Sequence, residues 1–526
     1  MPDPATDARP DALWYPGRWA REVPDRPAIV HADTGEAITY AQLHADAVRI
    51  ARVLRERGLE PGDHVAWCLE NRLEHLVVTW GARYAGLVAT AISYQLTAAE
   101  IAYIVDDCGA RAFVASPATG ERATEVIEAT PGVEVRLSVG GDVEGHERLE
   151  PLLEGVSPEE PDGLVAGTDM LYSSGTTGRP KGVAMPFRDV PLGTDPERLE
   201  SCRRNYGFVD DFTYLNPAPL YHAAPQRFCV RAHRGGGTVV VMPRFDAERA
   251  LAAIERFRVT TGQWVPTMFV RMLQLPAEVR ERYDVSSLTH AIHAAAPIAI
   301  PTKRAMIDWW GPILHEYYSG TERAGATYVD SHDWLERPGT VGRASEGVIH
   351  IVGEDGEELP VGEEGAVYFE SAGDFEYHGD PEKTAAARHP KGWTTMGDIG
   401  RVDEDGYLFL TDRKAFTIIT GGVNVYPQEA EDVLIVHPEV IDAAVFGIPN
   451  DDFGEEVKAV VQPAEWPADD EAAEALERRL IDACRAQLAA VKCPRSVDFR
   501  RELPRHPTGK LYKRLLRDEY RAAHDA

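Results

Sequence analysis

The sequence contains few cysteines, and none of them is arranged as a metal ligand. Its 526 residues include six cysteines, with no Cys-x-x-Cys pair and no histidine at ligand spacing from a cysteine. Scattered cysteines of this kind are typical of reduced, mostly buried thiols in a cytoplasmic protein. We therefore expect a cytoplasmic protein in which most of these thiols are buried: Cys68, Cys108, Cys202, Cys229, Cys484 and Cys493.

The sequence also lacks a long apolar run. Crossing a bilayer takes about 20 apolar residues, and the best candidate, LVVTWGARYAGLVATAIS, is interrupted by Arg83. The first residues, MPDPATDARPD, are acidic and contain proline, unlike a signal or transit peptide. With 44% hydrophobic and 27% charged residues, the composition is that of a soluble globular protein with more than one core. We expect no integral association with a membrane.

Positive charge is scarce. The chain has 55 lysine and arginine residues against 85 aspartate and glutamate residues, which gives a net charge of −30. This charge repels nucleic acid and anionic lipid over long range, so neither is an expected partner. An acidic protein that binds a polyphosphate has to concentrate positive charge locally, and the segment PRHPTGKLYKRLLR near the C-terminus does so. The same segment is also compatible with a solvated helical face.

One short stretch, YSSGTTGRPKG at 172–182, combines glycines, hydroxyl side chains and a lysine. It does not match the P-loop pattern, in which Gly-Lys-Ser/Thr follows the first glycine after four residues. Its glycines still let the backbone approach a phosphate, and its hydroxyl and ammonium groups are hydrogen-bond donors. The flanking apolar runs GTDMLYS and GVAMPF predict a loop between two strands, which favours a phosphate loop over a surface turn. The candidate phosphate ligands are Ser173, Ser174, Gly175, Thr176, Thr177, Gly178 and Lys181.

Short apolar runs alternate with helical periods from about residue 60 onward. The runs HVAWCL, VATAIS and RAFVAS predict buried strands, and Ile101, Ile104 and Val105 share one face of a helix that ends near Gly109. A second set of strands and a helix follows between 213 and 266. This alternation predicts parallel strands joined by right-handed crossovers.

The pattern changes after about residue 345, where strands joined by Asp-Gly turns predict hairpins. From 412 onward a smaller set of strands and helices predicts an α+β domain. The expected fold is therefore α/β, with a large N-terminal part at 1–411 that contains layered α/β subdomains and a β-rich subdomain. A small mobile α+β C-terminal domain is expected at 412–526.

Five motifs follow one another along the chain. The first two are YSSGTTGRPKG at 172–182 and YYSGTE at 317–322. GWTTMGDIG at 392–400, DRKAFTIITGGVNVYPQEAE at 412–431 and PRHPTGK at 504–510 complete the set. In this order they resemble the phosphate loop, the Tyr-Gly-x-Thr-Glu motif, the Thr-Gly-Asp segment, the domain junction and the terminal lysine motif of the adenylate-forming acyl-CoA synthetases. These enzymes are related to peptide-synthetase adenylation domains and luciferases, and the resemblance covers almost the whole chain.

The resemblance implies a two-step ligase whose cofactors and co-substrates are ATP, Mg²⁺ and coenzyme A. A small-molecule carboxylic acid attacks the α-phosphorus of ATP, pyrophosphate leaves, and a thiol then attacks the acyl-adenylate. Such chemistry needs positioning and charge neutralisation more than covalent help. The motifs do not report the second nucleophile, so an amine acceptor, or another activated oxyanion such as nitrite, stays open. A catalytically silent scaffold is a third interpretation, and the joint presence of all five motifs argues against it.

The resemblance also implies which residues bind ATP. Thr321 hydrogen-bonds the α-phosphate and Glu322 holds Mg²⁺, which makes both catalytic residues. Tyr318 offers a flat face to adenine, and Asp398 accepts hydrogen bonds from the ribose hydroxyls. Taken alone, Tyr318 is compatible with a core aromatic and Asp398 with a turn residue. The further implied ATP contacts are Ala295, Ala296, Pro297, Ser319, Gly320, Arg413 and Lys510.

The same resemblance gives Lys510 and His222 catalytic roles. Lys510 bridges the carboxylate of the acid and the α-phosphate, and His222 is a gate beside the acyl pocket. The C-terminal domain then rotates, so that Gly421 and Gly422 line the channel for coenzyme A. Taken alone, Lys510 is compatible with an exposed charge near the C-terminus, and His222 with a hydrogen-bonded core histidine.

The sequence departs from the family pattern at two places. Ala415 and Phe416 stand where the hinge usually has a polar residue, which leaves the pivot of the C-terminal domain open. Ser319 stands where a glycine often borders the substrate. The residues expected to line the acid pocket are His222, Gln226, Arg227, Trp264, Val265 and Ser319. Their mixture suits a mid-sized apolar or aromatic acid that carries a polar group.

Overall fold

The structure of the chain is a computed structural model. It describes residues 13–173, 180–194, 196–209, 211–370, 375–413, 416–420, 423–450, 453–505 and 511–524. The described residues of 1–175, 179–293 and 374–381 pack into one compact unit, here called the first unit. Those of 294–373 and 382–526 pack into a second unit. The boundary expected between residues 411 and 412 stays a prediction.

A six-stranded sheet of the first unit has the order β7-β6-β5-β3-β4-β8. Its strands are β3 (His64–Cys68), β4 (Val88–Ile92), β5 (Ala110–Ala115), β6 (Val135–Ser138), β7 (Glu147–Arg148) and β8 (Thr168–Asp169). All its pairings are parallel. Parallel neighbours need crossover connections, which here run through α3 (Leu73–Tyr84) and α4 (Ala98–Asp107). The predicted layered α/β arrangement is confirmed.

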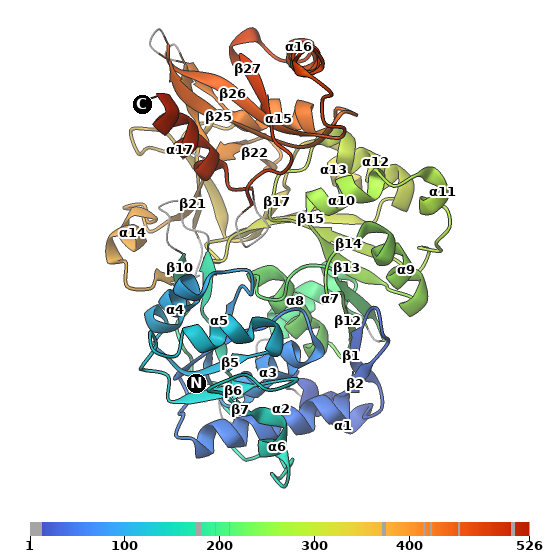
Figure 1. Cartoon of the computed structure of the whole chain (residues 1–526), viewed down its shortest axis with the longest axis vertical. Helices are drawn as coiled ribbons and strands as arrows, with labels where there is room; N and C mark the ends of the chain where they lie inside the picture. Colours follow the sequence, from blue (N-terminus) through green and yellow to red (C-terminus); the bar gives the residue numbers. More distant parts are fainter. Residues whose placement is uncertain are drawn as a thin grey trace. The chain divides into compact units, whose positions relative to one another are not determined.

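Helices cover both faces of this sheet. Ala66, Cys68 and Phe113 face a core shared with α4 and α5 (Gly120–Glu125). Their neighbour Trp67 points the other way, because side chains alternate along a strand, and its indole donates to His75 of α3 at 3.1 Å. Figure 1 shows α5 and α2 (Tyr40–Glu56) on opposite sides of β5 and β6. The sheet is therefore buried on both faces, which explains its nearly unbroken apolar strands.

The helix α4 follows its sequence signals closely. Thr97 accepts a hydrogen bond from the backbone N–H of Glu100, and the Glu100 carboxylate accepts one from the N–H of Thr97 in return. This reciprocal cap starts the helix, and the predicted face of Ile101, Ile104 and Val105 is buried. Because this face is buried, the helix cannot rotate about its axis, and the directions of its remaining side chains are fixed.

A second sheet of the first unit has the order β2-β1-β12-β11-β13-β14. Its strands are β1 (Pro27–His31), β2 (Ala37–Thr39), β11 (Thr213–Asn216), β12 (Thr238–Val241), β13 (Thr261–Trp264) and β14 (His290–His293). The pairs from β1 to β14 are parallel, while β1 and β2 are antiparallel. The helices α8 (Ala223–Arg234) and α9 (Ala247–Phe257) connect β11 to β12 and β12 to β13.

A third, antiparallel sheet of the first unit has the order β20-β10-β9. It consists of β9 (Leu171–Ser173), β10 (Lys181–Ala184) and β20 (Glu376–Tyr377). The expected strand over GTDMLYS is divided, since β8 pairs with β4 and β9 with β10. The expected strand over GVAMPF ends at Ala184, because Pro186 lacks the N–H that a strand would use.

The second unit contains antiparallel strands. β15 (Leu314–Ser319), β16 (Ala326–Asp330) and β17 (Arg343–Glu346) pair in sequence order. β18 (Val348–Val352), β19 (Gly365–Glu370), β21 (Thr394–Val402) and β22 (Leu408–Arg413) form a four-stranded sheet in that order. The Asp-Gly turns expected here are present, with Gly356 and Gly406 at φ of +82° and +83°, a region that glycine adopts without strain. The predicted β-rich part is confirmed.

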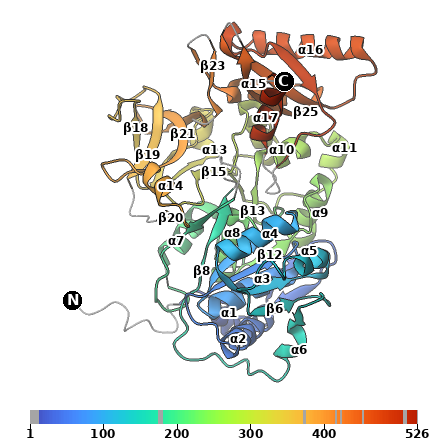
Figure 2. The same cartoon turned by 60° about the vertical axis from the view of Figure 1, so that its left-hand side comes forward.

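The C-terminal part of the second unit is a sheet with helices on both faces. The order is β24-β23-β26-β25, and β27 pairs with β26. The strands are β23 (Ile418–Thr420), β24 (Val423–Val425), β25 (Val440–Asn450), β26 (Gly454–Pro463) and β27 (Ser496–Phe499). Ala443 and Val445 face α15 (Pro427–Ile435) and α16 (Asp470–Arg485), while Ala444 and Phe446 face α17 (Lys513–His524). Figure 2 shows these helices around β25, and the α+β composition expected here is confirmed.

The remaining helices are short. They are α1 (Pro16–Glu22), α6 (Leu149–Leu153), α7 (Pro196–Tyr206), α10 (Pro266–Leu273), α11 (Ala277–Arg280), α12 (Ile300–Trp310), α13 (Ser331–Glu336) and α14 (Pro381–Ala386). Among the described residues, no helix has the length and apolar character that a bilayer-spanning segment requires.

Candidate functional site

The strands β9 and β10 form the two stems of the glycine-rich loop. Ser173 faces Lys181 in this antiparallel pair, and Tyr172 faces Gly182. The predicted loop between two strands is therefore confirmed at its ends. The predicted phosphate ligands at 174–178 lie outside the described residues, as does the side chain of Ser173. The side chain of Lys181 is mostly buried and forms an ion pair with Asp380.

Two side chains of α4, one helical turn apart, hold the two stems. The Tyr172 hydroxyl donates to Asp107 Oδ2 at 2.5 Å. The Tyr103 hydroxyl donates to the carbonyl oxygen of Pro180 at 3.3 Å. Burial, with the nearby Cys108 and the bond to Asp107, raises the pKa of Tyr172 above its usual range, so this phenol stays a neutral donor. Both ends of the loop are thus fastened to one rigid helix.

Close packing explains one glycine of the motif. A Cβ atom on Gly182 would lie 3.2 Å from Met170 Cε, 3.2 Å from Tyr172 Cζ and 3.3 Å from His378 Cβ. These separations are shorter than ordinary van der Waals contacts, so a side chain at this position would require its neighbours to shift by a few tenths of an ångström.

A buried ion cluster holds the strand β8, which leads into the first stem. Asp169 is 3% exposed, and its Oδ1 lies 2.5 Å from Arg227 Nη2. Its Oδ2 lies 3.3 Å from Arg83 Nη2. Burial lowers the pKa of Arg83, although Asp169 opposes this effect. Arg227 comes from α8 and Arg83 from α3, so this carboxylate joins three elements.

Three of the residues expected around the acid, His222, Trp264 and Val265, follow or end strands of the second sheet. β11 and β13 are parallel neighbours, so their carboxyl ends meet at the same edge, where α/β proteins bind ligands. His222 follows β11 and precedes α8, with its ring 4.5 Å from that of Tyr221. Trp264 and Val265 stand at the end of β13, where Trp264 is 1% exposed.

Gln226 and Arg227 are both buried in the first turn of α8. The Nε2 of Gln226 lies 3.5 Å from Thr79 Oγ1. Its Oε1 is buried and has no hydrogen-bond partner among the described residues. The guanidinium of Arg227 contacts Asp169, as described above. The expected contact of Arg227 with the acid stays a prediction. Gln226 thus retains a buried acceptor that no described residue uses.

In the second unit, Tyr318 and Asp398 meet although they come from different strands. Tyr318 stands near the end of β15 and Asp398 on β21. The Tyr318 hydroxyl donates to Asp398 Oδ2 at 2.5 Å. Asp398 is 7% exposed, while Tyr318 is half-buried with its ring 6.2 Å from that of Phe369. One face of Tyr318 therefore packs on the core, and its polar end contacts the candidate ribose ligand.

The segment after Tyr318 forms a tight turn, in which Gly320 lies close to Met396 of β21. Ser319 Oγ donates to the carbonyl oxygen of Gly325 at 2.8 Å, which makes its hydroxyl part of the turn. A Cβ atom on Gly320 would lie 2.5 Å from Glu322 Oε2 and 2.7 Å from Met396 Sδ. The Glu322 carboxylate thus folds back over Gly320, and any side chain at residue 320 would displace it. Thr321 lies between them and is half-buried.

The expected adenine wall is a short exposed loop before α12. Ala295, Ala296 and Pro297 are exposed. Ala295 has φ of +75°, a left-handed conformation that costs a residue with a Cβ atom about 1 kcal/mol or more. Backbone strain of this kind concentrates at ligand-binding sites, where the surrounding structure holds it in place.

A buried ion pair joins α12 to β15. Lys303 is 0% exposed and Glu316 is 4% exposed, and Lys303 Nζ lies 2.5 Å from Glu316 Oε2. The ammonium also lies 4.8 Å from the ring centre of Trp334. Burial lowers the pKa of Lys303, and the attraction of Glu316 opposes this effect. Because Glu316 precedes Tyr318 by two residues on β15, the pair fixes the strand that carries Tyr318 relative to the helix that follows 295–297.

Several predicted residues of the C-terminal part lie outside the described residues. Arg413 is described in its backbone, which pairs with Asp398 across β21 and β22. Phe416 is half-buried, and its ring centre lies 5.4 Å from Lys513 Nζ. The predictions that lie outside the described residues concern Gly421, Gly422, Lys510 and the side chain of Arg413.

All six cysteines are buried, and none of them forms a disulfide. Burial raises the pKa of Cys68 and Cys108 to about 12, so these thiols are protonated at neutral pH. A thiol is a poor nucleophile in this form. The buried free thiols expected from the sequence are confirmed.

The described residues contain no group of three or more histidine, cysteine or acidic side chains placed to hold a metal ion. Magnesium does not require such a cage, because it commonly binds one or two carboxylates together with substrate phosphate oxygens. The Glu322 carboxylate, folded over Gly320 beside the candidate α-phosphate ligand Thr321, fits that mode.

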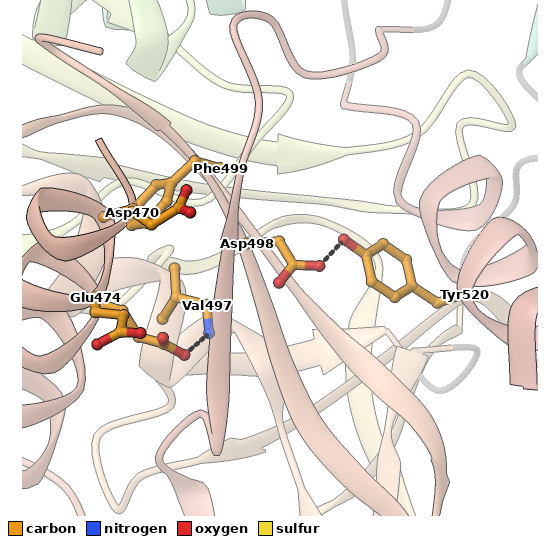
Figure 3. A pocket seen from close by; sticks show the side chains of 8 residues that line it. Asp470, Glu474, Val497, Asp498, Phe499 and Tyr520 are labelled. Carbon is orange, nitrogen blue, oxygen red and sulfur yellow. Dashed lines mark hydrogen bonds between the residues drawn. The ribbon is translucent and has the colours of Figure 1, made fainter. Parts of the chain in front are cut away.

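A separate hollow lies at α16, β27 and α17, with a volume of about 440 Å³. Figure 3 shows the hydrogen bond that Tyr520 donates to Asp498. The backbone N–H of Val497 donates to Glu477 Oε1 at 2.8 Å. Asp498 also lies 2.7 Å from Lys458 Nζ. None of the motif residues lines this hollow, and the acidic groups named here have partners, so we assign it no part in the reaction.

Comparison with known proteins agrees with the motifs. The family model described as AMP-binding enzyme matches residues 17–376, and the model described as AMP-binding enzyme C-terminal domain matches 429–510. A long-chain-fatty-acid–CoA ligase, FadD13 of Mycobacterium tuberculosis, is 32% identical over 97% of this chain and 98% of its own length. A feruloyl-CoA synthase of Amycolatopsis sp. is 32% identical over 96% of this chain and 98% of its own length.

A solved structure has the same fold. The amide bond synthetase McbA from Marinactinospora thermotolerans superposes with a TM-score of 0.79 at 28% identity, and covers 95% of this chain and 99% of its own. The family models span most of the chain, so the resemblance predicted from the five motifs is confirmed. The chain belongs to the family of AMP-binding, adenylate-forming enzymes.

Proposed function

We propose that this chain is an AMP-forming acid:CoA ligase, which uses ATP to activate a carboxylic acid and transfers the acyl group to coenzyme A. In the first step a carboxylate oxygen bonds to the α-phosphorus of ATP, and the bond from that phosphorus to the bridging oxygen breaks to release pyrophosphate. In the second step the sulfur of coenzyme A bonds to the acyl carbon, AMP leaves, and the thiol proton passes to solvent.

The observation that carries this proposal is the contact between Tyr318 and Asp398. These residues are separated by 80 positions, yet their side chains are hydrogen-bonded in the second unit. A hydrogen-bonded carboxylate beside a half-buried aromatic ring suits a ribose and its base. The candidate metal ligand Glu322 follows on the same segment. The motifs at 317–322 and 392–400 are therefore in contact, which supports a shared role in binding a nucleotide.

We assign the residues the following parts. Mg²⁺, held by Glu322, supplies charge neutralisation on the phosphate oxygens when it is bound. Thr321 hydrogen-bonds the α-phosphate, Lys510 neutralises charge between acid and α-phosphate, and His222 borders the acid. The residues proposed to bind the remaining parts of ATP are Ser173, Ser174, Gly175, Thr176, Thr177, Gly178, Lys181, Ala295, Ala296, Pro297, Ser319, Gly320 and Arg413.

The C-terminal domain at 412–526 is proposed to move between the two steps, after which Gly421 and Gly422 line the channel for coenzyme A. The thiol for the second step comes from coenzyme A, which agrees with the buried, protonated state of Cys68 and Cys108. The reduced state of all six thiols supports the proposed cytoplasmic location.

We propose that the acid is mid-sized and apolar or aromatic, and that it carries a hydrogen-bond donor. The apolar contact comes from Trp264 and Val265, at the carboxyl end of β13. The unused acceptor Oε1 of Gln226 supports a donor group on the acid. A buried acceptor without a partner lowers stability by about 1–3 kcal/mol, and a donor on the bound acid would remove that penalty. A hydroxyl or amino substituent on the acid supplies the missing partner.

The second candidate function keeps the first step and replaces coenzyme A by an amine. The specific observation in its favour is the likeness to an amide bond synthetase. The two relatives named as CoA ligase and CoA synthase are more similar in sequence, at 32% identity, which favours coenzyme A as the acceptor.

The test of the proposed first step is acid-dependent exchange of labelled pyrophosphate into ATP. A panel should pair each acid with its hydroxyl-bearing analogue, for example cinnamic with hydroxycinnamic acids and straight-chain with ω-hydroxy fatty acids. We expect exchange to require both Mg²⁺ and an acid, and to be fastest with a donor-bearing acid. Absence of exchange across the whole panel would contradict adenylation of a carboxylic acid.

A further inference from the structure

The ion pair between Lys181 and Asp380 joins two segments that are 199 positions apart in the sequence. Both side chains are about three-quarters buried, with exposures of 21% for Lys181 and 26% for Asp380. No family motif named above includes Asp380. Asp380 follows β20, the strand that pairs with the stem β10, and the role of its carboxylate beside Lys181 is not explained by the motifs.

Backbone hydrogen bonds fix Asp380 beside the stem. Val183 of β10 faces Tyr377 of β20 in the antiparallel sheet. Beyond that pair, the N–H of His378 donates to the carbonyl oxygen of Gly182 at 2.8 Å. The N–H of Asp380 then donates to the carbonyl oxygen of Tyr377 at 3.0 Å, which turns the chain back toward Lys181. The carboxylate is thus presented to the ammonium by a rigid strand pair.

We propose that Asp380 is a resident counter-ion, which occupies Lys181 until the pyrophosphate part of ATP arrives and takes Lys181 back when pyrophosphate leaves. This inference rests on the proposed function, because it requires Lys181 to bind phosphate oxygens. A carboxylate and a phosphate are both anionic oxygen ligands for one ammonium group. The two anions compete for Lys181, and they also repel each other when both are near it.

Two consequences follow for the reaction. An unpaired, mostly buried ammonium would attract any anion, whereas the ammonium paired with Asp380 is released only by a ligand with several negative charges. When Asp380 pairs with Lys181 again, it also helps pyrophosphate to leave. Once pyrophosphate has left, the acyl-adenylate can no longer react back to ATP. Asp380 is therefore a specificity-determining residue for the polyphosphate, and it makes no contact with the acid in this account.

The test is the isosteric substitution Asp380→Asn, which removes the charge and retains the shape. A partly exposed ion pair is worth up to about 1 kcal/mol, so its loss should tighten the binding of pyrophosphate about three- to fivefold. Calorimetry with inorganic pyrophosphate and Mg²⁺ measures this affinity directly. The KM for ATP and the inhibition constant for pyrophosphate should fall by a similar factor, while the KM for the acid stays the same.

The matched control is Glu376→Gln, which removes one negative charge from an exposed residue of the same segment. It should leave the affinity for pyrophosphate unchanged, because Glu376 faces Ala184 and is remote in register from Lys181. If Asp380→Asn lowers the thermal unfolding midpoint markedly, Asp380→Ser provides a second neutral variant with a smaller side chain. It should show the same gain in affinity.

The outcomes separate a failure of the counter-ion proposal from a failure of the proposed function. Pyrophosphate affinity that is unchanged or weaker in folded Asp380→Asn, while the unmodified protein adenylates an acid, overturns the counter-ion and leaves the proposed function intact. An equal gain in Glu376→Gln overturns it also, since the effect would then be general electrostatics. If the unmodified protein neither binds pyrophosphate nor adenylates any acid, the proposed function fails and this inference fails with it.

Discussion

The hydrogen bond from Tyr318 to Asp398 is the contact whose removal tests the nucleotide site most cleanly. Tyr318→Phe deletes one oxygen atom and keeps the ring that packs beside Phe369. The acceptor is a carboxylate that is 7% exposed, and the bond length is 2.5 Å. Without this donor, a buried carboxylate loses a partner that fixes its orientation.

The structure sets the size of the expected effect. A hydrogen bond to a charged group contributes about 1.5–3 kcal/mol, and 1.4 kcal/mol corresponds to a factor of ten in affinity. Tyr318 is only half-buried, which places the expected effect near the lower limit. We therefore expect Tyr318→Phe to raise the KM for ATP about tenfold, with a smaller change in kcat and none in the KM for the acid.

Tyr317→Phe is the matched control, because Tyr317 is adjacent on β15 and its side chain points to the opposite face of the strand. The assay is initial-rate pyrophosphate release, with ATP varied at saturating acid and then acid varied at saturating ATP. An unchanged KM for ATP in Tyr318→Phe, or an equal rise in Tyr317→Phe, would refute the assignment of Tyr318 and Asp398 to the nucleotide.

Three further expectations concern neighbouring groups. Glu322→Gln should shift the Mg²⁺ titration of activity to higher concentration, since an amide is a poorer ligand for a hard cation; an unchanged titration would make Glu322 structural. Lys510→Ala should slow ATP–pyrophosphate exchange about 10²- to 10³-fold and leave thioester formation from preformed acyl-adenylate largely intact, whereas equal loss of both steps would contradict two conformations. Lys303→Met should lower the free energy of unfolding in urea by about 3–5 kcal/mol, because it leaves the Glu316 carboxylate buried without its partner. Lys303→Met combined with Glu316→Leu should recover most of that loss, and a loss below about 1 kcal/mol in the single variant would show that the pair is unimportant.

Local sequence patterns predicted the elements of this fold well. The spacing of Ile101, Ile104 and Val105 defined the buried face of α4, and continuous apolar runs gave the parallel strands of the first unit. The Asp-Gly pairs at 355–356 and 405–406 marked turns in the β-rich part. These signals are readable because each depends on residues that are neighbours in the sequence.

The supporting contacts of the site could not be read in that way. Tyr172 and Asp107 are 65 positions apart, and Lys181 and Asp380 are 199 apart, so no local period connects them. Ala295 shows a second limit, since an alanine gives no sign of a left-handed φ. The five motifs could be found from sequence because each has its own local pattern. The residues that position them became visible only through the packing of distant elements.

The most direct test of the central claim is a single-turnover experiment with the unmodified protein, ATP, Mg²⁺ and an acid that supports pyrophosphate exchange. Before an acceptor is added, acyl-adenylate should accumulate on the protein with one pyrophosphate released for each adenylate formed. Addition of coenzyme A should then release AMP rapidly, in a one-to-one ratio with an acyl thioester. If coenzyme A leaves the release of AMP unchanged while an amine accelerates it and yields an amide, the ligase assignment is contradicted.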